Sequence, residues 1–149
     1  MEKMTKEQLA NMFDHTLLKP FATNEDFQRL CEDSKKYGFK MVAVNSAPVA
    51  LCKEYLKGSG VHVGAAVSFP LGQTTIECKV FETKDAIANG ADEIDMVISI
   101  GALKDGDYET VKSEIEAVKA ACKGRILKVI IETCLLTEDE KITMCRIVS

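Results

Sequence analysis

The chain has 149 residues, a formal net charge of −4, 46% hydrophobic residues and six cysteines. This length is enough for one domain whose hydrophobic core needs neither disulfides nor a metal, so we expect residues 1–149 to form a single domain. The basic residues are scattered, which argues against nucleic acid or an anionic membrane as a partner. No run approaches the roughly 18 apolar residues of a membrane helix, and the charged start MEKMTKEQLA is unlike a secretory signal, so we expect a cytoplasmic protein.

Short apolar runs alternate with helical patterns along the whole chain. A short helical pattern comes first, and runs of strand length follow at 12–18, 41–45, 62–69, 93–100 and 127–133. Capping boxes are predicted for the pairs Thr5 and Gln8, Thr74 and Glu77, and Thr137 and Glu140. The glycines expected to end helices are Gly38, Gly58, Gly90 and Gly124. This alternation predicts about five parallel βα units preceded by a short N-terminal helix.

Polar residues recur on one face of the predicted strands. In the run 93–100 the even-numbered residues are apolar, whereas Asp95 lies on the opposite face. In the run 127–133, Lys128 and Glu132 lie opposite the odd-numbered apolar residues. A flavodoxin-like nucleotide-binding sheet would be apolar on both faces, which disfavours that fold. Helices on one face and charges on the other are typical of a (β/α)8 TIM barrel; eight units need about 240 residues, so the chain is predicted to hold part of one.

Four charged residues are expected on this enclosed face, namely Asp14, Asp95, Lys128 and Glu132. An unpaired charge there would cost several kcal/mol, so we expect ion pairs. One interpretation is a network that only fills the interior, with Lys128 paired to Asp95 or Glu132. The other is an active site, in which Lys128 polarises a substrate and a carboxylate transfers protons. Neighbouring acids would keep Lys128 charged, which makes it a weak candidate for a nucleophile.

The remaining polar features favour structural roles. The backbone amides of the turn 68–74 could bind an anion, but a plain βα loop explains the same residues. His15 and His62 are isolated and are interpreted as packing or surface residues. The cysteines form no CxxC pair, and with only two histidines in the chain we expect separate reduced thiols and no metal site.

Four segments of the sequence resemble deoxyribose-phosphate aldolase, a class I aldolase family. They are DHTLLKP at 14–20, SFPLG at 68–72, NGADEIDMVI at 89–98 followed by IGAL at 100–103, and LKVIIET at 127–133. The segments occur in order over nearly the whole chain, and GADEIDMV and LKVIIET are the most specific of them.

The resemblance implies a β/α barrel that reversibly cleaves 2-deoxy-D-ribose 5-phosphate to D-glyceraldehyde 3-phosphate and acetaldehyde through a lysine Schiff base. It implies a small phosphorylated sugar as the substrate and no metal or other cofactor. Carried over by motif, Asp95 is similar to the proton-relay carboxylate and Lys128 to the lysine that assists carbinolamine formation. Asp14 and Thr16 resemble residues that line the substrate end of the site.

One departure from the family affects the expected activity. The family's Schiff-base lysine lies in a later strand, in a segment resembling FVKTSTG, and residues 1–149 contain no such segment. We therefore expect about five of eight units, a chain that stops inside a helical pattern, and no activity of these residues alone. A different hypothesis is a non-catalytic open half-barrel that another chain completes. Under both readings, unpaired strand edges favour association, so a homo-oligomer is expected.

Overall fold

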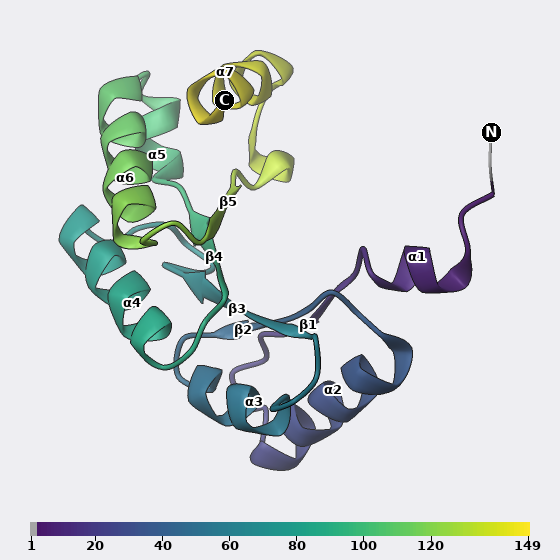
Figure 1. The fold of residues 1–149 in the computed structure, drawn as a ribbon. Helices are drawn as coiled ribbons and strands as arrows, with labels where there is room; N and C mark the ends of the chain where they lie inside the picture. The colour runs from purple at the N-terminus through teal and green to yellow at the C-terminus, as the bar shows by residue number, and fades with distance from the viewer. Residues whose placement is uncertain (1–2) are drawn as a thin grey trace. The chain divides into compact units, whose positions relative to one another are not determined.

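The computed structural model describes residues 3–149 and confirms the predicted alternation of strands and helices (Figure 1). The strands are β1 (Asp14–Leu17), β2 (Met41–Asn45), β3 (His62–Val67), β4 (Glu93–Val97) and β5 (Ile126–Ile130). The α-helices are α1 (Lys6–Ala10), α2 (Asn24–Tyr37), α3 (Val49–Tyr55), α4 (Ile76–Ala88), α5 (Ile100–Lys104), α6 (Tyr108–Ala121) and α7 (Glu138–Val148), and a 3-10 helix, η1, spans Thr133–Leu135. The five strands form one parallel sheet in the order β1-β2-β3-β4-β5.

The chain divides into two compact units that interleave in the sequence. The first unit comprises the residues up to Ala65 together with Ala86–Glu93, and the second comprises Ala66–Asp85 and Ile94–Ser149. β3, α4 and β4 each contribute residues to both units. A single domain over 1–149 stays a prediction.

In the first unit, β1 and β2 pair in parallel with Asp14 opposite Met41. Helices α2 and α3 pack together against these strands (Figure 1), and the core between them includes fully buried Val42, Val44 and Cys52. Met41 also explains the small residue at Gly64, because a Cβ atom at Gly64 would collide with the Met41 thioether.

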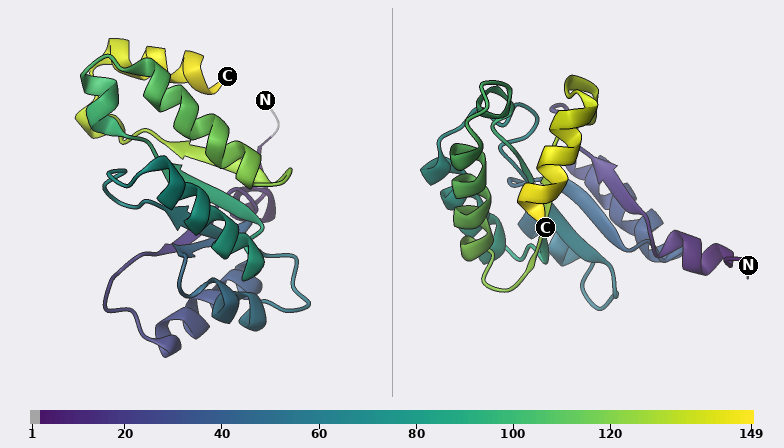
Figure 2. Two further views of the ribbon diagram at one scale, coloured as in Figure 1. Left: turned by 90° about the vertical axis from the view of Figure 1, so that its left-hand side faces the viewer. Right: turned by 90° about the horizontal axis from the view of Figure 1, so that it is seen from above.

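In the second unit, a hydrophobic cluster joins the helices to the ends of the strands. Its buried members are Ile98, Leu103, Val111, Leu136 and Met144, and Val129 and Ile131 pack against them. Helix α7 lies alongside α6 (Figure 2) and contributes Met144 to this cluster. No helix within residues 3–149 is long and apolar enough to cross a membrane.

Four of the five predicted strands are shorter than their apolar runs, and at the carboxyl ends the difference is largest for β4 and β5. β4 ends at Val97 rather than at residue 100, and β5 ends at Ile130 rather than at residue 133. Ile98 and Ile131 lie just beyond the ends of β4 and β5 and pack in the cluster of the second unit. An apolar run therefore marks burial, and only the backbone hydrogen bonds decide where a strand stops.

The helix-start predictions are right at two of three positions. Thr5 and Thr137 form the predicted capping boxes. At the start of α4, the prediction is wrong, because the Thr75 hydroxyl accepts the Cys78 amide while the Thr74 hydroxyl is bonded to Ser68. A further capping box at Thr23, with Asp26 at the third position, was not predicted.

Candidate active site

Asp95 of β4 and Lys128 of β5 form an ion pair, with 3.3 Å between Nζ and Oδ1. The Asp95 side chain is 14% exposed and that of Lys128 39% exposed. The neighbouring residues Ile94, Met96 and Val129 alternate with the pair and are buried or packed in the core. The predicted face is therefore confirmed here, because side chains alternate along a strand and the charged pair lies opposite the helix-packed residues.

Glu132 does not lie on the same strand as Lys128, which corrects the predicted face. It follows the end of β5 with a left-handed backbone (φ 53°), an uncommon conformation for a residue with a side chain. Its Oε1 accepts a hydrogen bond from the Cys134 thiol, with 3.1 Å between the heavy atoms. This bond to the Glu132 carboxylate raises the pKa of Cys134 above its ordinary value.

A surface hollow of about 510 Å³ lies where the loops after β3, β4 and β5 meet in the second unit. Its lining residues are Pro70, Leu71, Gln73, Ile100, Gly101, Lys104, Glu132, Cys134 and Leu135. Lys104 is paired with Glu140, at 2.7 Å between Nζ and Oε2. The carboxyl ends of parallel strands are the usual position of active sites in β/α barrels, so this hollow is on the expected side of the sheet.

Asp14 and Thr16 are both exposed residues of β1 in the first unit. The Thr16 hydroxyl donates a hydrogen bond to the backbone carbonyl of Asp14, at 2.9 Å. Asp95 and Lys128, by contrast, belong to the second unit. The pair that the structure brings into contact is thus Asp95 and Lys128, and a substrate-lining role of Asp14 and Thr16 stays a prediction.

The turn 68–74 is held by internal hydrogen bonds. The Ser68 amide donates to Glu82 at 2.9 Å, and the Gly72 amide donates to the Ser68 carbonyl at 2.8 Å. A side chain at Gly72 would collide with the carbonyl oxygen of Ile98, just beyond β4. Both of these amides already have acceptors within the protein, so neither is available to an anion.

The two histidines differ in their surroundings. The His15 ring packs edge-on against Phe39, with 5.1 Å between centroids, and Nδ1 lies 3.1 Å from the Ser34 hydroxyl. His62 Nδ1 lies 2.7 Å from the buried Glu93 carboxylate, in the first unit. His15 therefore fits the packing interpretation, and His62, whose side chain is 37% exposed, fits the surface interpretation while also contacting Glu93, which was not predicted.

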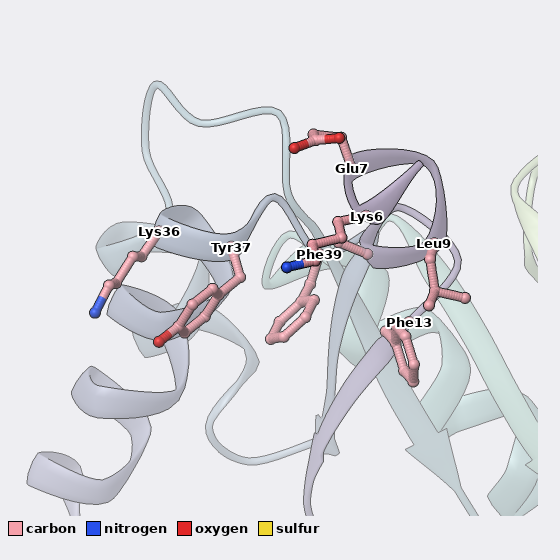
Figure 3. Close-up of a pocket in the computed structure, with 8 residues that line it drawn as sticks. Lys6, Glu7, Leu9, Phe13, Lys36, Tyr37 and Phe39 are labelled. Carbon is pink, nitrogen blue, oxygen red and sulfur yellow. The ribbon is translucent and has the colours of Figure 1, made fainter. Parts of the chain in front are cut away.

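A second hollow, of about 520 Å³, lies between α1 and the end of α2. Figure 3 shows Phe13, Phe39 and Tyr37 along it, and their rings are 5.7 to 6.0 Å apart in neighbouring pairs. Its lining contains none of the predicted site residues, so these aromatic contacts are interpreted as packing of the N-terminal segment against α2.

The structure contains a buried ion pair between Lys79 of α4 and Glu114 of α6 that was not predicted from the sequence. The side chains are 0% and 2% exposed, with 2.6 Å between Nζ and Oε2. In the sequence, both residues look like members of solvated helix faces, since lysine and glutamate are rarely buried unless they are paired. Only the contact between two helices distant in sequence identifies them.

The six cysteines are free thiols in the described part of the chain, as expected. Cys31, Cys52 and Cys122 are buried and the other three are exposed. Within residues 3–149, no three His, Cys, Asp or Glu side chains are grouped so that they could hold a metal ion.

Comparison of the sequence with known proteins identifies a family. The model of the DeoC/LacD family aldolases matches residues 8–144. The chain is 57% identical over 146 residues to a deoxyribose-phosphate aldolase of Bacteroides thetaiotaomicron, covering 97% of this chain and 61% of the relative. It is 54% identical over 145 residues to that of Clostridium perfringens strain SM101, covering 97% and 65%.

Solved structures give the same result. A deoxyribose-phosphate aldolase from Aeropyrum pernix, described as having a unique tetrameric structure, matches with a TM-score of 0.82 and 27% identity, over 97% of this chain and 62% of that chain. An aldolase named QR15 matches with a TM-score of 0.89 and 29% identity, over 93% and 62%. These matches confirm the predicted β/α fold class, and the chain spans less than two thirds of the length of these relatives. The family model, the two relatives and the aldolase structures agree, and the chain belongs to the DeoC/LacD family of aldolases.

Proposed function

We propose that the protein to which residues 1–149 belong is a deoxyribose-phosphate aldolase. It reversibly cleaves 2-deoxy-D-ribose 5-phosphate to D-glyceraldehyde 3-phosphate and acetaldehyde through a lysine Schiff base. The observation that supports this most strongly is the Asp95–Lys128 ion pair on the helix-free face of β4 and β5, in a chain 57% identical to a protein of that name. The substrate is a small phosphorylated sugar, and the electron sink is the protonated imine, so the proposed chemistry requires no metal or cofactor.

In this proposal Asp95 relays protons and Lys128 assists the formation of the carbinolamine. Asp95 is largely shielded from water and has an ammonium group 3.3 Å away. A shielded carboxylate in this position can exchange a proton with a bound substrate, while the ammonium group can polarise a carbonyl oxygen. Asp14 and Thr16 are proposed to line the substrate end of the site.

The substitution Asp95→Asn tests the relay in the longer polypeptide that carries these residues. We expect turnover to fall by about 10²–10⁴-fold while the fold is kept, since this is the typical contribution of a positioned acid or base. Lys128→Met should also lose turnover, and Lys112→Met is its control, because Lys112 lies on the exposed surface of α6 and is paired with Glu116 of its own helix. Unchanged turnover in Asp95→Asn would remove Asp95 from the mechanism, and an inactive parent protein would support the non-catalytic half-barrel instead.

The nucleophile is proposed to come from outside residues 1–149. A lysine attacks a carbonyl only as the free amine, and the Asp95 carboxylate at 3.3 Å stabilises the ammonium form of Lys128. Residues 1–149 alone are therefore expected neither to cleave deoxyribose 5-phosphate nor to form a stable imine. Borohydride added with acetaldehyde or substrate, followed by intact mass, checks this expectation. A single adduct on Lys128 together with measurable cleavage would identify Lys128 as the nucleophile and contradict the proposal.

We also propose that the protein is a homo-oligomer. β1 and β5 are the first and last strands in the order of the sheet, and outer strands are the ones that can pair with another chain. The tetrameric description of the Aeropyrum pernix structure supports the same idea. Light scattering during size-exclusion chromatography measures the molecular mass, and a strict monomer would contradict association.

The proposed compartment is the cytoplasm. All six cysteines are free thiols, and thiols stay reduced in that compartment. Fractionation of the source cells tests the location.

A further inference from the structure

The buried Lys79–Glu114 pair contacts the backbone at the end of β4, the strand that contains Asp95. Lys79 projects from α4 and Glu114 from α6, two helices that run next to each other (Figure 1). Neither side chain reaches solvent to any useful extent, at 0% and 2% exposure. The pair therefore interacts only with protein groups, and these groups determine what it does.

Both members of the pair bind the backbone at the end of β4. Lys79 Nζ donates to the carbonyl oxygen of Val97 at 2.9 Å. Glu114 Oε1 accepts the amide of Ser99 at 2.6 Å, while its Oε2 holds the lysine at 2.6 Å. These hydrogen bonds connect α4 to the carbonyl of Val97 and α6 to the amide of Ser99. Val97 is two residues beyond Asp95.

Stability alone is a poor reason for such a pair. Removing two charges from water costs several kcal/mol, and apolar replacements of buried ion pairs are often neutral or stabilising. The specific feature here is that one carboxylate joins a lysine from α4 to an amide just past the end of a strand. A charged acceptor gives a shorter and stronger hydrogen bond than a neutral one, so the pair is suited to fixing a position.

We propose that Lys79 and Glu114 are positioning residues that hold the end of β4 and thereby orient Asp95 toward Lys128. The catalytic consequence rests on the proposed function, whereas the restraint on the backbone at Val97 and Ser99 does not. Displacement of reacting groups by about 1 Å can cost about 10²-fold in rate, so a restraint so close to the proton relay is expected to affect turnover.

Two double variants separate positioning from core filling. Lys79→Met/Glu114→Gln and Lys79→Met/Glu114→Leu both remove the ion pair and leave no unpaired buried charge. Only the first keeps an oxygen that can accept the Ser99 amide. The measurement is amide hydrogen exchange at Ser99 in the purified chain, followed by ¹⁵N-resolved spectra. Thr83→Val is the control, because Thr83 is buried in α4 and its hydroxyl has no hydrogen-bond partner in the described residues.

We expect Ser99 exchange in the leucine variant to be about tenfold faster or more, as the loss of one hydrogen bond implies. The glutamine variant should exchange at a rate between those of the parent and the leucine variant, because a neutral acceptor binds the Ser99 amide more weakly than the carboxylate does. Thr83→Val should stay near the parent rate. Equal Ser99 exchange in the two folded double variants would overturn the positioning role. If the leucine variant does not fold, Glu114→Asp replaces it, since aspartate keeps the charge but withdraws it from Ser99; faster exchange supports the proposal and unchanged exchange overturns it.

Turnover in the longer, active polypeptide supplies the second measurement. The leucine double variant should lower kcat by about 10- to 100-fold with KM nearly unchanged, and the glutamine variant should lose less, because it keeps an acceptor for the Ser99 amide. Equal kcat in the two variants would overturn the catalytic part of the proposal. An inactive parent protein would instead contradict the proposed function, and unchanged turnover in Asp95→Asn would remove Asp95 from the mechanism. Neither result would alter what the exchange rate at Ser99 says about the backbone restraint.

Discussion

The substitution Gly72→Ala should destabilise the second unit more than any ordinary glycine replacement at a turn. Gly72 has a φ of +68°, where an alanine costs about 1 kcal/mol because its Cβ approaches the backbone. The new Cβ would also collide with the carbonyl oxygen of Ile98 and lie 3.1 Å from Val97 Cγ1. Overpacking typically costs about 1–3 kcal/mol, so we expect a total loss of about 2–4 kcal/mol in the free energy of unfolding.

Gly106→Ala is a matched control for this prediction. Gly106 has a similar φ of +76°, but a Cβ built there meets nothing within 4 Å. Its replacement should therefore cost only the conformational share, about 1 kcal/mol. Urea unfolding of the two variants and the parent gives both values, and the difference between them isolates the contact with Ile98. If the two variants lose the same stability, the close approach of the turn to the end of β4 has no energetic role.

Two further predictions follow from perturbed pKa values. Burial alone would raise the pKa of Asp92, but hydrogen bonds from the Lys53 ammonium and the Val63 amide lower it below its ordinary value. The unfolded chain then binds the proton more readily than the folded chain, so the Asp92 carboxylate stabilises the fold above about pH 4. This contribution, at most about 1 kcal/mol, is lost as the pH falls further. Asp92→Asn should therefore reduce the loss of unfolding free energy between pH 6 and pH 3, and an unchanged loss would contradict the assignment. The Glu132 carboxylate raises the pKa of Cys134, so Glu132→Gln should increase the alkylation rate of Cys134 by iodoacetamide at pH 8, because the thiolate is the reactive form. Peptide mass spectrometry measures the rate with exposed Cys145 as the internal reference, and a rate that does not rise would mean that Glu132 does not control this thiol.

The part of the fold that depends on local sequence pattern could be predicted. Strands β2 and β3 begin where the apolar runs begin, and Gly38 ends α2 in the left-handed conformation that glycine tolerates. The charged pair could also be placed on one face, because alternation along a strand assigns Asp95 and Lys128 to faces without knowledge of their neighbours. These features follow from a few consecutive residues each.

The features that the sequence did not predict depend on contacts between distant segments. The end of β5 and the left-handed conformation of Glu132 depend on where the sheet loses its hydrogen bonds, which the apolar run through Ile131 conceals. The burial of Lys79 and Glu114 requires α4 and α6 to meet, 35 residues apart in the chain. A charge is tolerated in a core only when its partner and hydrogen bonds are already there, so no local pattern distinguishes this pair from charges on a solvated helix surface. The sequence by itself determined the order of the elements and the strand face on which Asp95 and Lys128 lie. The tertiary structure alone decided which buried groups bind the backbone at the end of β4, the strand that contains Asp95.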